Sequence, residues 1–198
     1  MRRFILSFTV ITLVSFYSLA LGQEKASQVE AQPKTNIEKF IAQKGEVIIK
    51  SYTELGSISG DFGSNVSVDA KEFLNASSGR KTFGISIEVK EGGKYEKSNT
   101  SYIDDDEIDS LIKGIDYVSK IDKTITKFDN FEAQYITRGE CKIIVYSLKS
   151  GISAAIDSGT LGRATCFLSL EQLQKFKQEF RRKFPNFCHK YCKINMLG

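Results

Sequence analysis

The fold is decided by a stretch that occurs twice, YIDDDEI at residues 102–108 and FLSLEQL at residues 167–173. In each copy an aromatic-aliphatic pair, typical of a strand end, precedes a residue that can cap a helix, Asp104 or Ser169. A Glu or Gln follows three positions later, as a capping box requires. Each copy therefore predicts a strand that runs into a capped helix, and the recurrence predicts an internal duplication.

The residues after each copy have the apolar spacing of an amphipathic helix. Positions i, i+3 and i+7 are apolar in both, namely Ile108, Leu111 and Ile115 in the first and Leu173, Phe176 and Phe180 in the second. Side chains at this spacing lie on one face of a helix. We therefore expect helices over about residues 104–120 and 170–183, the second ending before Pro185.

Strand patterns precede both predicted helices. Apolar residues alternate with polar ones in segments separated by turn residues, which is typical of half-buried antiparallel strands. The first half predicts strands at about residues 46–55, 66–70, 83–89 and 94–102, and the second at about 131–135, 141–148, 152–156 and 164–168. The sequence thus predicts an α+β fold with a duplicated β4-α repeat, over about residues 46–121 and 131–183, whose two antiparallel sheets close on each other.

The N-terminal residues predict export. Arg2 and Arg3 precede 18 uncharged, mostly apolar residues that end in small side chains, the pattern of a signal peptide over residues 1–22. The alternative is an uncleaved anchor, because a spanning helix needs roughly 17 to 25 apolar residues. We expect cleavage before Gln23, no membrane span in the mature chain, and a secreted or periplasmic location.

The remaining chain is long enough for one domain with a core of its own. Residues 23–35 are polar and predict a linker, and Thr35 with Glu38 predicts a capping box for a short helix that ends before Gly45. We expect a single α+β domain over residues 36–185 and a cysteine-containing basic tail over residues 186–198. Loss of Arg2 and Arg3 lowers the net charge from +4, so the mature protein is nearly neutral.

Two resemblances follow from particular residues. The strand-helix duplication, with Leu161-Gly162-Arg163 leading into residues 167–173, resembles the fold shared by the Whirly and Pur-alpha single-stranded nucleic-acid-binding proteins. That resemblance implies a fold; the basic patch that Whirly proteins use is not found, so nucleic acid is not the expected partner. Four blocks resemble small secreted bacterial proteins of unassigned function, which implies a bacterial envelope location: residues 66–73, 101–117, 130–135 and 151–156.

Few residues suggest chemistry. The acidic run at residues 104–107 with Asp109 has two interpretations, a helix start that favours negative charge or a calcium site; we prefer the first, because an EF-hand loop needs alternating ligands and a glycine. Cys188, His189 and Cys192 lack a fourth zinc ligand. The sequence contains no familiar catalytic motif and one histidine. We therefore expect no enzyme activity, no metal and no cofactor.

The cysteines are disulfide candidates, because an even number in an exported chain suggests pairing. They are Cys141, Cys166, Cys188 and Cys192, which allow three pairings. The simplest combination joins Cys188 to Cys192 and Cys141 to Cys166, although the last two fall on strands that a simple meander does not make neighbours. Alternatively, the tail cysteines attach residues 186–198 to the second sheet.

The C-terminal region gives the best case for a charged partner. Basic residues alternate with aromatic ones there, and the polyanion-binding candidates are Lys175, Lys177, Arg181, Arg182, Lys183 and Lys190. The simpler interpretation makes them the solvated side of an amphipathic helix. The leading hypothesis is therefore an exported, non-enzymatic binding module for an unknown macromolecule or small ligand, and a homo-oligomer is compatible with it. The alternative is binding of a polyanion or single-stranded nucleic acid through the basic C-terminal helix and tail.

Overall fold

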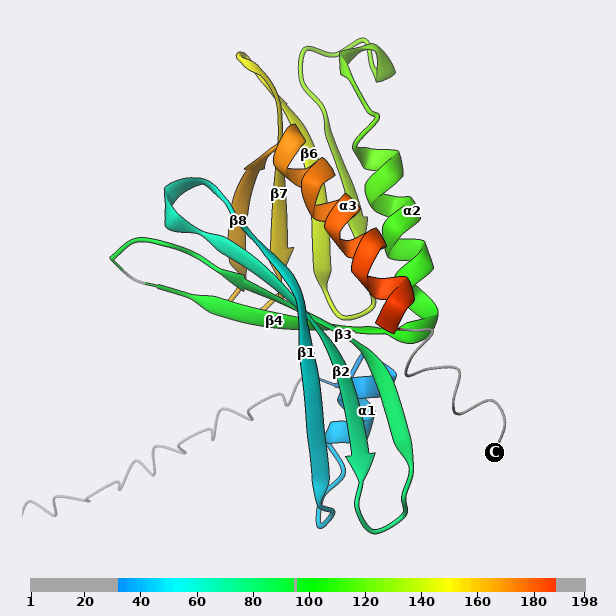
Figure 1. Cartoon of the computed structure of the whole chain (residues 1–198). Helices are drawn as coiled ribbons and strands as arrows, with labels where there is room; N and C mark the ends of the chain where they lie inside the picture. Colours follow the sequence, from blue (N-terminus) through cyan, green and yellow to red (C-terminus); the bar gives the residue numbers. More distant parts are fainter. Residues whose placement is uncertain (1–31, 95, 188–198) are drawn as a thin grey trace, which may run out of the picture. The chain divides into compact units, whose positions relative to one another are not determined.

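The computed structural model describes residues 32–94 and 96–187, with side chains to residue 183 (Figure 1). The predicted signal peptide, most of the linker and residues 188–198, which hold Cys188, Lys190 and Cys192, lie outside the described residues. Among the helices of the described part, none is long and apolar enough to cross a membrane.

Two four-stranded antiparallel sheets form the frame of the domain. Sheet A has the order β1-β2-β3-β4, with β1 Ile48–Ser59, β2 Asn65–Asn75, β3 Lys81–Lys90 and β4 Ser98–Asp104. Sheet B has the order β5-β6-β7-β8, with β5 Glu132–Ile136, β6 Cys141–Leu148, β7 Gly151–Ser158 and β8 Ala164–Ser169. Helix α2, Ile108–Val118, follows the first sheet and α3, Leu170–Phe187, follows the second. The predicted α+β class and the β4-α order are confirmed.

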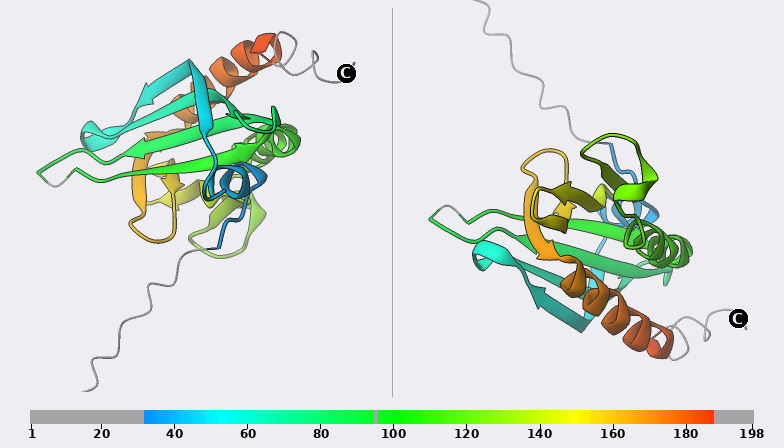
Figure 2. Two further views of the ribbon diagram at one scale, coloured as in Figure 1. Left: turned by 90° about the horizontal axis from the view of Figure 1, so that it is seen from below. Right: turned by 90° about the horizontal axis from the view of Figure 1, so that it is seen from above.

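Four short elements complete the described chain. Helix α1, Asn36–Ile41, follows the N-cap residue Thr35, whose capping box with Glu38 is formed as predicted. Single 3-10 turns occupy Asp61–Gly63 (η1), Asp105–Glu107 (η2) and Lys123–Ile125 (η3). Figure 2 shows α1 and α3 on opposite sides of sheet A.

The predicted helix boundaries need two corrections. The first helix begins at Ile108 and not at residue 104, because the turn η2 separates it from β4 and Asp104 makes no side-chain capping bond to it. Helix α3 continues through Pro185 to Phe187, although we expected it to end before the proline. A proline removes one backbone hydrogen bond and crowds the carbonyl four residues earlier, and at residue 185 this cost falls within the last turn of the helix. The second predicted capping box is confirmed, since Gln172 N–H donates to Ser169 Oγ at 3.1 Å and Ser169 N–H to Gln172 Oε1 at 2.7 Å.

The main core lies between the two sheets and helices α2 and α3. Its buried side chains come from both repeats, for example Val68 and Ile87 of sheet A, Ile143 and Ile156 of sheet B, and Phe176 of α3. All six apolar helix positions that the sequence singled out are buried in this core. Burial of aliphatic side chains at about 25 cal/mol per Å² is the dominant favourable contribution to folding.

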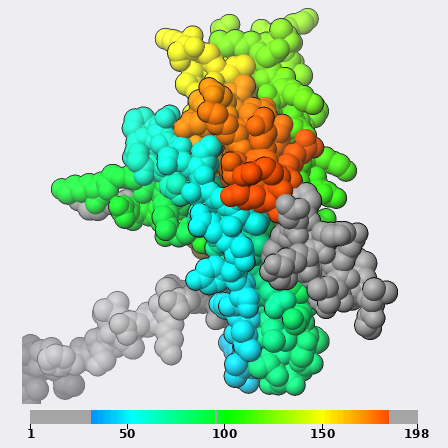
Figure 3. Space-filling model, viewed as in Figure 1, coloured from blue at the N-terminus to red at the C-terminus, as the bar shows by residue number. Residues whose placement is uncertain are grey.

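A second, smaller core lies on the other face of sheet A. Ile37 and Phe40 of α1 pack there against Phe73 of β2, with Tyr102 of β4 at the edge. Because successive strand residues point to opposite faces, Phe73 faces away from the core that holds Val68. Strand β2 therefore changes its buried face along its length, and the lower half of sheet A extends past α3 (Figure 3).

Candidate functional site

The outer face of sheet B forms an open groove. Side chains alternate along each strand, so those between the buried positions point away from the core. Lys142 of β6 lies opposite Asp157 of β7, and the neighbouring row sets Ile144 beside Ala155, which in turn lies beside Phe167 of β8. This sheet-B groove has a volume of about 350 Å³, within the size range of small-molecule sites.

Asp157 is the most unusual residue of the groove. Its exposure is 3 %, and its Oδ1 atom has no hydrogen-bond partner among the described residues. Its Oδ2 atom lies 3.6 Å from Nη1 of Arg163, at the distance of a loose ion pair. A buried carboxylate oxygen without a donor is costly, and native structures rarely keep one. The protein therefore leaves this acceptor unpaired beneath the surface of the groove.

An aromatic wall borders this acceptor. Phe167 is 41 % exposed and meets Phe62 edge to face, with 6.4 Å between ring centroids. Phe62 is 84 % exposed and has a backbone φ of 57°, a left-handed conformation that is uncommon for a bulky side chain. Tyr146 lies in the same groove, where burial and then the charge of Asp61 raise the pKa of its phenol. Tyr146 therefore keeps its proton at neutral pH and offers the groove a hydroxyl group that is able to donate.

The charges that line the groove balance. Lys142 and Arg163 are cationic, whereas Asp157 and Glu132 are anionic. With Tyr146, Gln134 and Thr165 they provide both donors and acceptors, beside the exposed ring of Phe167. Such a surface suits a polar, uncharged ligand with one apolar face, because an isolated net charge on the ligand finds repulsion as well as attraction.

The cysteines within the described residues do not form a reactive pair. Cys141 and Cys166 are buried free thiols, so the predicted bond between them is not formed. Strand β7 separates their strands, which places them two inter-strand spacings apart, and a disulfide requires adjacent backbones. Burial, with smaller effects from Asp157 and Glu107, raises the pKa of Cys141 to about 12. Burial also raises the pKa of Cys166, against a hydrogen bond from Ser64 that lowers it.

The basic residues of α3 are engaged within the chain. Lys177 lies 2.6 Å and Arg181 3.1 Å from the carboxylate of Asp116 on α2. The remaining described candidates lie within 3.7 Å of acidic residues of α3 itself, Lys175 with Glu171 and both Arg182 and Lys183 with Glu179. All five described polyanion-binding candidates therefore have carboxylate neighbours, as expected for the solvated side of an amphipathic helix.

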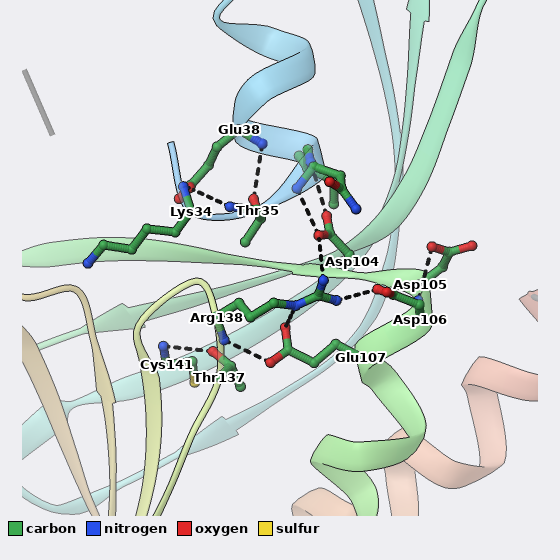
Figure 4. Close-up of polar contacts among 12 residues, drawn as sticks. Lys34, Thr35, Glu38, Asp104, Asp105, Asp106, Glu107, Thr137, Arg138 and Cys141 are labelled. Atoms are coloured by element: carbon green, nitrogen blue, oxygen red, sulfur yellow. Dashed lines mark hydrogen bonds and ion pairs between the residues drawn. The ribbon is translucent and has the colours of Figure 1, made fainter. Parts of the chain in front are cut away.

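The acidic run joins three parts of the fold (Figure 4). Asp104 accepts hydrogen bonds from the backbone N–H groups of Asn36 and Ile37, at 2.8 and 3.0 Å, and thus caps α1 instead of α2. Glu107 accepts from the backbone N–H of Arg138 at 2.7 Å and from its Nε at 3.3 Å. The predicted capping box between Asp104 and Glu107 is therefore wrong, because both carboxylates bind partners distant in sequence. The part of the chain that the structure describes contains no cluster of metal-ligating residues.

Sequence reasoning missed the residues of the groove. Asp157 follows the apolar run Ala154-Ala155-Ile156 within a strand, and an acidic residue in such a setting is the one signal that pointed to it. Lys142 and Arg163 are distant from Asp157 in sequence. The pairing of β6 with β7 brings Lys142 beside it, and the turn between β7 and β8 brings Arg163 there. No family model, curated protein or solved structure matches the chain.

Proposed function

We propose that this protein is an exported, non-enzymatic binding module whose ligand occupies the sheet-B groove. The observation that carries the proposal is the unpartnered, buried Oδ1 atom of Asp157. Protein atoms cover Oδ1, so the Asp157 carboxylate has to turn toward the groove on binding. A ligand hydroxyl that then donates to it removes the penalty of the unpaired acceptor. Export rests on the basic pair and the apolar stretch of residues 1–22.

The ligand class follows from the mixture of charges in the groove. A hydroxyl group donates to Asp157 and accepts from Arg163 or Lys142. The ring of Phe167 offers an apolar contact for the flat, carbon-bearing face of a sugar ring. We therefore assign to the groove a neutral ligand that carries several hydroxyl groups, such as a short saccharide.

Substitution of Asp157 tests the proposal. Calorimetric titration of neutral oligosaccharides into the mature protein is compared with the same titration of Asp157→Thr, which removes the open acceptor and suits a strand. Asp69→Thr is the matched control, because Asp69 is also a strand aspartate but belongs to β2 of sheet A, away from the sheet-B groove. Its carboxylate lies 2.8 Å from Nζ of Lys71. We expect Asp157→Thr to weaken binding about tenfold or more and Asp69→Thr to leave it unchanged.

Two results contradict the proposal. Saccharide affinity that is equal in the protein and in Asp157→Thr places the ligand elsewhere. Binding only of polyanions, with an affinity that falls steeply as salt is added, supports instead the basic helix and tail. The ion pairs of α3 weigh against this second result, because each of its described basic residues already has an acidic neighbour.

We further propose that the two repeats share the arrangement of the Whirly and Pur-alpha proteins. The order of four strands and a helix, given twice, supports this relation. The resemblance to small secreted bacterial proteins stays a proposal of the same kind. A crystal structure superposed on members of the Whirly and Pur-alpha families tests the first relation, and it fails if the two sheets pack in a different relative orientation.

A further inference from the structure

Strand β1 has an edge that the described chain leaves open. It is the first strand of sheet A and pairs only with β2. Because Ala76 N–H donates to Val47 C=O at 2.9 Å, the odd-numbered residues Ile49, Ser51 and Thr53 direct their backbone groups toward β2. The backbone N–H and C=O groups of the residues between them point outward: Ile48, Lys50, Tyr52 and Glu54.

Side chains occupy backbone groups at the other end of β1 and on β8, one of the two edge strands of sheet B. Gln172 Nε2 donates to Ser59 C=O at 2.9 Å, where α3 crosses β1. Glu91 Oε1 accepts from Thr165 N–H of the edge strand β8 at 2.9 Å. Residues 49–54 are instead exposed on both faces, and Tyr52 has 71 % of its surface in contact with solvent. An extended edge of this kind is a template for another strand.

The side chains of the edge select a second copy of the same strand. In a two-fold antiparallel pair centred on Tyr52, Lys50 lies opposite Glu54 of the second copy, and the same pair recurs on the other side of the axis. Within the described residues neither side chain takes part in an ion pair. Moving the axis by two residues places Lys50 against Lys50 or Glu54 against Glu54, so charge favours one register.

Backbone geometry agrees with this register. The residues that pair across the axis are all even-numbered, so each pair brings together backbone groups that point outward on both strands. The β-bulge between Glu54 and Gly56 bends β1 just beyond the last of these residues. It therefore limits the paired segment to residues 50–54 and keeps the second copy away from α3.

We propose that β1 pairs with β1 of a second copy and joins two A sheets into one eight-stranded sheet. The axis passes through Tyr52, and each side of it carries a Lys50 to Glu54 ion pair. Figure 1 shows sheet B, which carries the groove, at the other end of the domain from the first half of β1, so the dimer carries two separate grooves.

Charge exchange tests the pairing. Lys50→Glu places two carboxylates opposite each other on both sides of the axis, and Glu54→Lys places two ammonium groups there; like charges directly opposite destabilise a strand pair. By sedimentation equilibrium of the full mature chain, we expect each single variant to raise the dimer dissociation constant about tenfold or more. The double variant Lys50→Glu/Glu54→Lys restores opposite charges, and we expect it to dimerise like the unchanged protein.

A backbone variant separates pairing from charge. Tyr52→Pro removes an N–H that points outward, and so it leaves the bonds to β2 in place. We expect this variant to be monomeric with a thermal midpoint close to that of the unchanged protein at low concentration. We expect a dimer dissociation constant of about 1 μM. The proposal is overturned if the unchanged protein stays monomeric up to about 100 μM, roughly 100 times that value. A dimer that persists in both single charge variants, or in folded Tyr52→Pro, overturns it as well.

Discussion

Among the described residues, loss of the guanidinium of Arg138 should destabilise the domain more than loss of any other arginine. This side chain contacts three carboxylates of the first repeat from the β5-β6 turn of the second: Glu107 at 3.3 Å, Asp104 at 3.7 Å, and Asp106. The carboxylates of Asp104 and Glu107 are buried, whereas that of Asp106 is exposed. Asp104 keeps its two N–H donors in an Arg138→Met variant, and Glu107 keeps the backbone N–H of residue 138.

The magnitude follows from which contacts disappear. A hydrogen bond between charged groups contributes about 1.5–3 kcal/mol, and an exposed ion pair contributes about 0–1 kcal/mol. Removal of the buried pair outright would cost about 3–5 kcal/mol, but Arg138 is 41 % exposed, so solvent screens part of the loss. We therefore expect Arg138→Met to lower the free energy of unfolding by about 2–4 kcal/mol.

Urea unfolding followed by circular dichroism measures this change. The midpoint should fall while the slope with denaturant stays constant, because the surface exposed on unfolding is unaltered. Arg182→Met is the matched control, since Arg182 is 70 % exposed and lies 3.7 Å from Glu179; its cost should stay below about 0.5 kcal/mol. If Arg138→Met costs no more than this control, the network does not stabilise the fold as reasoned.

Three further predictions concern single side chains. Asp157→Thr should raise the free energy of unfolding by about 1 kcal/mol, because a costly open acceptor disappears; a thermal melt that falls instead contradicts the role given to this residue. The pKa of Asp116 lies below 3.8, mainly because Lys177 donates a hydrogen bond to its carboxylate. The ionised Asp116 therefore stabilises the folded state fully above its unfolded-state pKa, and this contribution is lost as the pH falls through its folded-state pKa. Lys177→Met should thus make the free energy of unfolding depend less on pH below about pH 4, as urea unfolding at several pH values will show. Cys141, with a pKa of about 12, should resist iodoacetamide at neutral pH until urea unfolds the chain, as peptide mapping by mass spectrometry will show.

Local pattern sufficed for much of the fold. The predicted strand at residues 141–148 matches β6, and both helices bury the apolar residues named from their spacing. The capping box at Ser169 formed because its partners are three residues apart and need nothing else. The same pattern failed at Asp104, because the N-terminus of α1 offers two N–H groups that no local rule can reveal.

The candidate site depended on information that the sequence does not carry. The role of Asp157 emerges only when strand register places Lys142 and Thr165 on either side of it and burial removes it from water. The basic residues of α3 were chosen by composition alone. Their contacts with Asp116 depend on the packing of α3 against α2, and the contact of Lys183 with Glu179 depends on their being one helical turn apart.

The change of buried face within β2 limits how this protein can alter its length in evolution. Val68 serves the large core and Phe73 the small one on the opposite face of the same strand. A single inserted or deleted residue between them would turn one of the two side chains to the wrong side. Lineages of this protein should therefore accept length variation at hairpin tips, such as residues 92–94 and 149–150, while the spacing from Val68 to Phe73 stays constant.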